Sequence, residues 1–89
     1  MVTLIVRHDV QDYSKWRQGY DENVGVRTNG GVRSDTVYRS VEDGNNLTVS
    51  HEFDSIEAAR AFAGSDELKA AMGALGVVGH PDIWFVEKA

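Results

Sequence analysis

The sequence contains no cysteine and only one proline among its 89 residues. Without cysteine there are no disulfides and no thiolate metal ligands to reinforce the fold. A chain of this length buries only about 60–65% of the surface that its unfolded form exposes, so a single hydrophobic core is marginally stable. We therefore predict one domain spanning residues 1–89 that gains stability by pairing with a second copy of itself.

Basic residues are also few, with nine Lys and Arg against fourteen Asp and Glu and a net charge of −5. They form no run, which argues against partners such as nucleic acid or an anionic membrane. No segment reaches the roughly 20 apolar residues of a membrane span, and the apolar residues 1–6 are too few for a signal peptide. A chain free of cysteine is compatible with the reducing cytosol, so we expect a cytoplasmic protein.

Sequence motifs for metal and phosphate chemistry are missing too. The three histidines have no HxxxH or acidic-plus-histidine spacing, so we expect no metal site. Gly30-Gly31 and residues 73–79 lack the spacing of a glycine-rich phosphate loop. Ser65 follows a glycine but has no nucleophile elbow around it. These absences indicate a protein that uses no metal or phosphate-bearing cofactor.

Hydrophobic periodicity defines the elements that are present. Alternating apolar residues predict four strands, over residues 2–9, 32–42, 47–53 and 81–88. Stripes of three- and four-residue spacing predict two helices, over residues 12–25 and 54–75. Asp12 or Ser14 can cap the first helix, Asp54 with Glu57 resembles a capping box for the second, and Ser65 can recap it after an interruption. The order βαββαβ predicts an α+β, ferredoxin-like fold, with a four-stranded antiparallel sheet and two helices on one face.

The third strand carries a histidine in an otherwise apolar row. Because side chains alternate with period two, one face of this strand holds Leu47, Val49, His51 and Phe53. The aromatic residues of the helices need an apolar floor, so we expect this face to point at the helices. The mixed face, with Arg7, Arg39 and Glu52, should point away from them.

Strand pairing determines which residues lie next to His51. If the polar hairpin turn closes tightly on Gly44-Asn45, Tyr38 lies opposite His51. Antiparallel pairing of the first and third strands places His8 near Leu47, four residues along from His51. That separation is roughly 13 Å, so the two histidines are not ligands of one metal ion.

The sheet face away from the helices should expose several apolar side chains in a monomer: Ile5, Val37, Val41 and either Trp84 or Phe85. Four strands of five or six residues present roughly 300–400 Å² of face. A patch of this size is at the limit that a soluble monomer tolerates. We therefore predict a homodimer in which two sheets cover each other and the charges of the mixed face pair.

Three stretches, at residues 52–59, 65–68 and 79–85, resemble the antibiotic biosynthesis monooxygenase family of dimeric α+β barrels. Residues 4–8, followed by Asp12-Tyr13 and Trp16, are similar to related small proteins labelled cyclases. The resemblance covers nearly the whole chain. It implies a dimer that binds an aromatic, polyketide-like molecule between sheet and helices, where the substrate itself activates oxygen without metal or flavin.

Several family positions differ in this chain. Val49 and Phe53 stand where the family has an Asn and a Trp on the third strand, and Lys69 stands where some members have a helix arginine. Haem-degrading relatives have a helix histidine at the position of Ala63, so the resemblance does not imply haem breakdown.

We predict that His51 is the catalytic proton-transfer group, because imidazole exchanges protons near neutral pH, and that Tyr38 orients it. The alternative is a buried histidine whose hydrogen bonds serve stability alone. The substrate contacts that we predict are His8, Trp16, Tyr20, Phe53, Phe62 and Lys69. The aromatic stripe can equally be plain core, and His8 a solvated strand end.

The predicted function is that of a cofactor-free monooxygenase or cyclase acting on an aromatic or polyketide-like molecule. The alternative is a non-enzymatic ligand-binding or stress-associated dimer of the same fold, because fold does not determine function. An open cavity of roughly a few hundred Å³ under His51 would favour the first, and a filled core between His51 and Phe62 the second.

Overall fold

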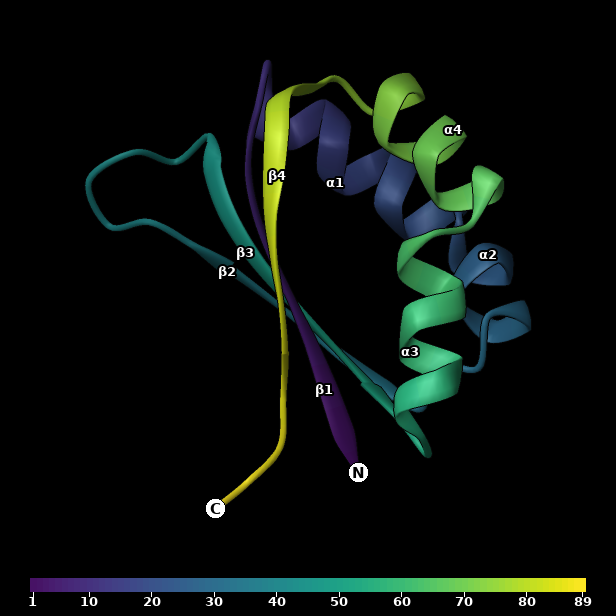
Figure 1. Ribbon diagram of the computed structural model, residues 1–89. Helices are drawn as coiled ribbons and strands as arrows, with labels where there is room; N and C mark the ends of the chain where they lie inside the picture. Colours follow the sequence, from purple (N-terminus) through teal and green to yellow (C-terminus); the bar gives the residue numbers. More distant parts are fainter.

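A computed structural model describes residues 1–89 as a four-stranded antiparallel sheet with helices on one face (Figure 1). The strands are β1 (Val2–Val10), β2 (Ser34–Arg39), β3 (Asn46–Phe53) and β4 (Val77–Val86). The helices are α1 (Tyr13–Glu22), α2 (Val24–Asn29), α3 (Ile56–Ala63) and α4 (Asp66–Ala74). The sheet order β2-β3-β1-β4 confirms the ferredoxin-like α+β fold, with each predicted helix divided in two. None of the helices is long and apolar enough to cross a membrane.

Side-chain caps set where the helices begin. Asp12 caps α1, as predicted, by accepting a hydrogen bond from the Ser14 N–H at 2.9 Å. The prediction that Asp54 caps the second helix is wrong, because the side chain of Ser55 caps α3 instead. Ser65 caps α4, as predicted, and so divides the second helical segment.

The histidine-bearing row of the sheet lies under the helices, as predicted. In the β1–β3 pairing, Leu4 lies opposite His51 and His8 lies opposite Leu47. The buried residues of these two strands are Leu4, Val6, His8, Val10, Leu47, Val49, His51 and Phe53. His8 is therefore buried, and the alternative of a solvated strand end is wrong.

The β2–β3 pairing differs by three residues from the predicted register. Asp35, not Tyr38, lies opposite His51. The chain does turn at Gly44-Asn45, where the Asn46 N–H donates to the Asp43 carbonyl at 3.0 Å. The ladder is nevertheless continued by Ser40, whose N–H donates to the Asn46 carbonyl at 2.9 Å, so residues 41–43 stand outside the strand pairing. Three is an odd number, so every β2 side chain lies on the opposite face of the sheet from the predicted one.

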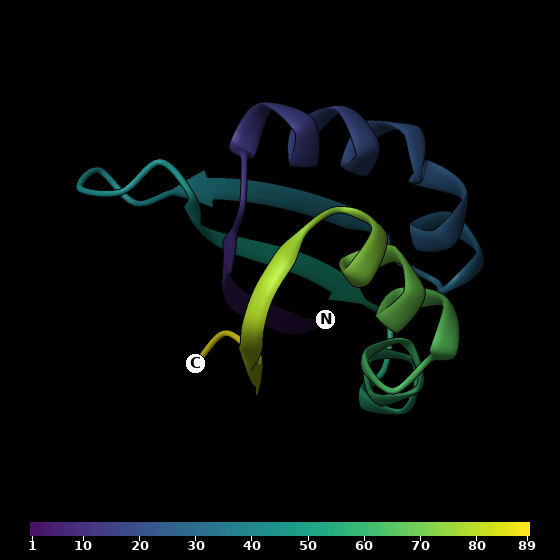
Figure 2. The same cartoon turned by 90° about the horizontal axis from the view of Figure 1, so that it is seen from above.

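The changed register moves several residues across the sheet. Val37 and Arg39 lie on the helix side, where the Arg39 guanidinium stacks 3.8 Å from the centre of the Tyr13 ring. Tyr38 points outward and is 58% exposed. Val41 is fully exposed in the connection, which projects beyond the sheet and helices in Figure 2. Val37, Val41 and Arg39 therefore do not lie on the outward face as predicted.

β4 begins four residues before its predicted start and contains Pro81 in its interior. Its pairing with β1 shifts between Arg7 and Asp9, next to Pro81. At such a bulge the missing N–H of proline does little harm to the ladder. His80 is an exposed residue of this same stretch.

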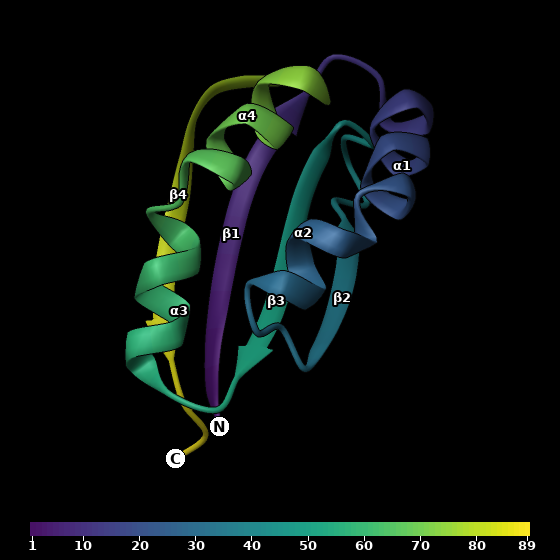
Figure 3. The same ribbon diagram turned by 90° about the vertical axis from the view of Figure 1, so that its right-hand side faces the viewer.

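The core consists of two separate clusters. The α3 cluster comprises Leu4, Val6, Phe53, Ala59 and Phe62. The α1 cluster comprises Val10, Trp16, Tyr20, Leu47 and Val49. Figure 3 shows the corresponding division of the helices, with α1 and α2 over the β2–β3 half of the sheet and α3 and α4 toward β1 and β4. The seam between the clusters is the only part of the helix-covered face where buried polar residues, His8 and His51, occur.

Truncation of Phe53, which is completely buried in the α3 cluster, should lower the free energy of unfolding by about 3–5 kcal/mol in Phe53→Ala. Thr48→Ala, on the outward face of the same strand, should cost less than about 1 kcal/mol. Urea denaturation checks both variants, with Phe53→Leu as a milder substitute if Phe53→Ala is unfolded. Equal losses at the two positions would contradict the assigned faces.

Candidate functional site

A narrow cavity of about 50 Å³ lies at the seam between the two clusters. Its floor is formed by β1 and β3, and its roof includes Leu68, Met72 and Leu75 from α4 and the residue after it. A water molecule needs about 10–15 Å³ in this measure, so the cavity can hold a few waters. Binding sites for drug-sized ligands have volumes of about 300–1,000 Å³, so an aromatic ligand requires the roof to move.

Five of the predicted site residues line this cavity: His8, Trp16, Tyr20, His51 and Phe62. Three do not. Phe53 packs behind Phe62, with the ring centres 5.5 Å apart. Lys69 is exposed on α4 and borders a different, shallower groove next to β4. Tyr38 lies on the other face of the sheet, so the predicted His51–Tyr38 pair is wrong.

The hydrogen-bond partner of His51 is Tyr20, which the sequence analysis had identified only as part of the pocket wall. The Tyr20 hydroxyl lies 2.9 Å from Nε2 of His51 and 2.6 Å from Oδ2 of Asp35. β3 supplies His51, the neighbouring strand β2 supplies Asp35 directly opposite it, and α1 supplies Tyr20 from above. A single hydroxyl therefore joins three elements of the fold.

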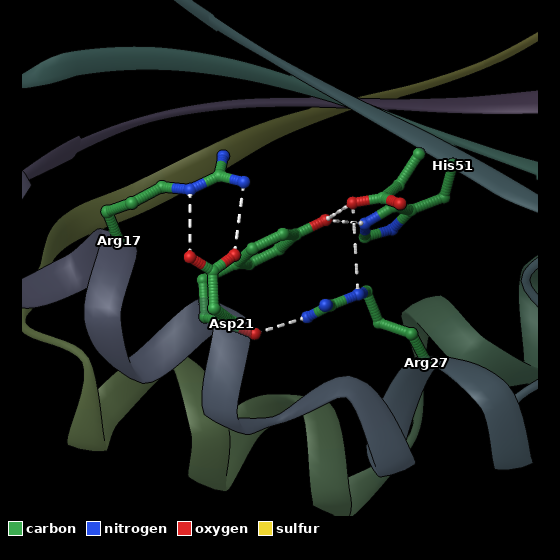
Figure 4. Close-up of polar contacts among 6 residues, drawn as sticks. Arg17, Asp21, Arg27 and His51 are labelled. Carbon is green, nitrogen blue, oxygen red and sulfur yellow. Dashed lines mark hydrogen bonds and ion pairs between the residues drawn. The ribbon is translucent and has the colours of Figure 1, made fainter.

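Arg27 completes this group from α2 (Figure 4). Its guanidinium lies 3.8 Å from the centre of the Tyr20 ring, and its Nη1 donates to the Tyr20 carbonyl at 2.6 Å. Its Nε is 3.9 Å from Oδ2 of Asp35. The Arg27 side chain is only 12% exposed, whereas that of Asp35 is 37% exposed. Cation–π attraction and the carboxylate together hold the arginine against the tyrosine.

Aromatic rings surround the polar group. Trp16 stacks on Tyr20 with the ring centres 4.6 Å apart, and Phe62 meets His51 edge-on at 5.4 Å. His8 lies 6.0 Å from Trp16. A flat aromatic ligand can stack on these rings in the same way as they pack against one another.

Burial determines the protonation of the site. Desolvation lowers the pKa of His51 to about 4, and it lowers the pKa of His8 as well. Burial, together with the hydrogen bond to Asp35, raises the pKa of Tyr20 well above its ordinary value. At neutral pH both histidines are therefore neutral and Tyr20 keeps its proton. The Nδ1 atoms of His8 and His51 are buried and have no hydrogen-bond partner within the chain.

Asp35 and Arg27 are functional candidates that sequence reasoning missed. Asp35 lies among mostly exposed residues of β2, and only the correct register places it beside His51. Arg27 lies beyond the predicted end of the first helix. The sequence does show that Asp35, Val37 and Arg39 alternate along β2 and therefore share one face of the sheet. That pattern does not indicate whether the face points toward the helices or away from them. No group of three or more His, Asp or Glu side chains is placed to hold a metal ion.

The fold and this site define a class of small α+β proteins with ferredoxin-like topology and a buried, largely apolar pocket between sheet and helices. The family model for antibiotic biosynthesis monooxygenases matches residues 1–74, and the chain belongs to that family. No curated protein sequence matches the chain.

Solved structures repeat the fold. A proposed antibiotic biosynthesis monooxygenase from Bordetella bronchiseptica has a TM-score of 0.84 at 14% identity, covering 99% of this chain and 96% of that one. SnoaB from Streptomyces nogalater, a cofactor-independent oxygenase, has a TM-score of 0.74 at 13% identity, covering 99% and 94%. Rv0793 from Mycobacterium tuberculosis has a TM-score of 0.71 at 20% identity, covering 99% and 94%. At these identities the likeness establishes the fold alone.

Acidification should destabilise the protein as the pH falls from about 6.5 to 4. In the unfolded chain His51 has its ordinary pKa of 6.5, whereas in the folded protein its pKa is about 4. The stability present above pH 6.5 is therefore lost on descending through this window, by about 3 kcal/mol for one such proton. The lowered pKa of His8 adds to this loss of stability on acidification.

Urea denaturation at several pH values measures this loss. His51→Phe should lose less stability over the window than the native protein, by about one proton's contribution. The same pH dependence in both proteins would show that His51 is not the buried titrating group.

Proposed function

We propose that the cavity at the seam is the centre of a binding site for a small aromatic, polyketide-like molecule, and that the protein oxygenates this molecule without a metal or flavin. The observation that carries the proposal is a neutral, buried histidine with an unpartnered nitrogen, set among aromatic rings. Family membership supports the reaction class, since the family is that of antibiotic biosynthesis monooxygenases and the fold is shared with the cofactor-independent oxygenase SnoaB.

A ligand enters by displacing the roof of the cavity. α4 contains no fully buried residue, so its side chains are held less firmly than those of α1 and α3. Met72 is unbranched and adapts its shape readily. Leu75 reaches across to α1, where the absence of a side chain at Gly19 makes room for it. Movement of these side chains enlarges the cavity while leaving both core clusters intact.

The chemistry follows from a neutral imidazole. With a pKa near 4, His51 is a weak base, so its main contribution is to accept a hydrogen bond from an acidic hydroxyl and favour the electron-rich anion. An aromatic carbanion or enolate of this kind reduces oxygen directly. For a methylene between two aromatic rings, CH₂ and O₂ give C=O and H₂O, so the atoms and electrons balance without an external reductant.

The second candidate function is non-enzymatic binding of the same class of ligand. The small cavity volume and the low pKa of His51 favour it, because both reduce the capacity for proton transfer. Oxygen consumption separates the two functions, since binding alone consumes none.

Oxygen uptake with 1,8-dihydroxyanthrone as substrate should exceed the uncatalysed rate in the native protein and fall by about 100-fold or more in His51→Ala. Quenching of tryptophan fluorescence reports binding through Trp16, which lines the cavity. His80→Ala, which removes an exposed histidine, is the matched control and should retain full activity. Binding without oxygen uptake would favour the non-enzymatic function, and neither binding nor uptake would contradict both.

We also propose that a second copy of the chain covers the outward face of the sheet. Trp84 lies opposite Ile5 on this face and is 48% exposed, while Phe85, opposite Leu4, lies on the helix side. Val86 and Tyr38 add exposed apolar area to the same face. Such a patch, at the limit for a monomer, is stabilised by burial against its own copy.

Two charged side chains on the outward face of the sheet are hydrogen-bonded within the chain. Arg7 donates to the Asn46 side chain at 3.1 Å, and Glu52 accepts from Ser34 at 3.0 Å. The predicted cluster with Arg39 does not form, because that residue lies on the helix side. Arg7 and Glu52 therefore each keep a hydrogen-bond partner within the chain when a second copy packs on this face.

Trp84→Glu should convert the dimer into a monomer, because it places a charge within the apolar patch that the second copy covers. Sedimentation equilibrium measures the mass in solution. Val41→Glu places the same charge in the exposed hairpin connection and should leave the dimer intact. A native protein that sediments as a monomer would refute this arrangement.

A further inference from the structure

The Tyr20 hydroxyl has one proton and two neighbours that compete for it. Oδ2 of Asp35 lies 2.6 Å away and Nε2 of His51 lies 2.9 Å away. Both distances are those of hydrogen bonds, so a proton must lie on each line. The position of the tyrosine proton therefore decides which nitrogen of the neutral His51 carries the hydrogen.

Tyr20 donates its hydrogen bond to the carboxylate. Asp35 is 37% exposed and faces the guanidinium of Arg27, so it is an ionised acceptor with no proton to donate. A hydroxyl that donates to a carboxylate forms a shorter and stronger hydrogen bond than one that donates to a neutral group. The 2.6 Å contact is the shorter of the two, as this requires. His51 must then donate from Nε2 to the Tyr20 oxygen.

We propose that Asp35, acting through Tyr20, is a positioning residue that fixes His51 as the Nε2–H tautomer, so that its Nδ1 lone pair selects ligands carrying an O–H or N–H donor. Nδ1 is buried and has no partner within the chain. Because Nδ1 finds no donor within the chain, a ligand O–H or N–H can supply its hydrogen bond on binding. The opposite tautomer would present an N–H and select carbonyl or ether oxygens instead.

Arg27 supports the assignment from the other side. It lies over the Tyr20 ring and within 3.9 Å of Asp35, so it keeps the carboxylate close to the hydroxyl. It also donates to the Tyr20 backbone carbonyl, which holds α1 and α2 in fixed relation around the hydroxyl. The ligand preference rests on the proposed binding function, whereas the tautomer is a property of the protein alone.

The tautomer is measured by two-bond ¹⁵N–¹H correlation spectra of the protein labelled at histidine. The His51 signals are identified by their loss in His51→Gln. The native protein should show a protonated Nε2 and an unprotonated Nδ1. In Asp35→Ala the Tyr20 proton has only His51 left as a partner, so the ring should change to the Nδ1–H form.

Two further variants test the cause. Asp35→Glu restores a carboxylate and should keep the Nε2–H form. Asp54→Ala removes an exposed carboxylate outside this group and should leave the spectrum of His51 unchanged. A native His51 in the Nδ1–H form, or an Asp35→Ala ring that stays in the Nε2–H form, overturns the proposal.

Ligand selection is tested with 1-naphthol and 1-methoxynaphthalene, which differ in one O–H. The native protein should bind 1-naphthol about tenfold more tightly, the equivalent of one hydrogen bond of about 1.4 kcal/mol, and Asp35→Ala should lose most of that preference. Equal affinity in the native protein overturns the ligand preference. Failure to bind either compound refutes the proposed binding function, and the spectra still decide the tautomer.

Discussion

The hydroxyl of Tyr20 is the interaction on which the site depends. From α1, this hydroxyl reaches the Asp35 carboxylate on β2 and the His51 imidazole on β3. Arg27 of α2 packs against the Tyr20 ring. A histidine buried this deeply without a hydrogen-bond partner would destabilise the folded protein. The tyrosine offsets that cost at Nε2, and the carboxylate, by accepting the tyrosine's hydrogen bond, leaves the tyrosine oxygen as the acceptor for the imidazole N–H.

The divided core explains where such a polar group can exist. Each cluster is compact and apolar, one under α1 and the other under α3. Tyr20 belongs to the α1 cluster through its ring, and its hydroxyl lies at the edge of that cluster, where it meets His51 and Asp35. The cavity follows from the same division, since the two helical arms approach one another through few side chains, such as Leu75 over Gly19. Stability comes from the two clusters, and the chemistry is confined to the seam between them.

Much of this fold can be predicted from the sequence because hydrophobic alternation records which face of a strand is buried. The inward position of His51, its neighbour Leu4 and the cap at Asp12 all follow from local patterns. The β2–β3 register does not, because the residues between Arg39 and Asn46 suit a tight turn and a wide one equally well by composition. β2 is an edge strand with little burial, so its own pattern cannot correct the error.

That single ambiguity accounts for the main error in the site. A tight turn brings Tyr38 to His51, and the observed connection brings Asp35 there instead. The aromatic stripe of the first helix correctly placed Tyr20 in the wall of the pocket. Periodicity predicts which face of a helix is buried, but it does not predict the position of the Tyr20 hydroxyl. The hydrogen bond between Tyr20 and His51 therefore cannot be predicted from the sequence pattern.

The length of the hairpin connection therefore belongs to the site, although its tip lies away from the cavity. A surface loop ordinarily tolerates insertions and deletions, because few contacts are lost. Here a change of one residue either bulges out within the loop or slides β2 by one step against β3. A slide would turn Asp35 to the outer face and leave the Tyr20 hydroxyl free to donate its hydrogen bond to the imidazole. Relatives or engineered variants that keep this network therefore need a loop in which any added or deleted residue leaves the β2–β3 register unchanged.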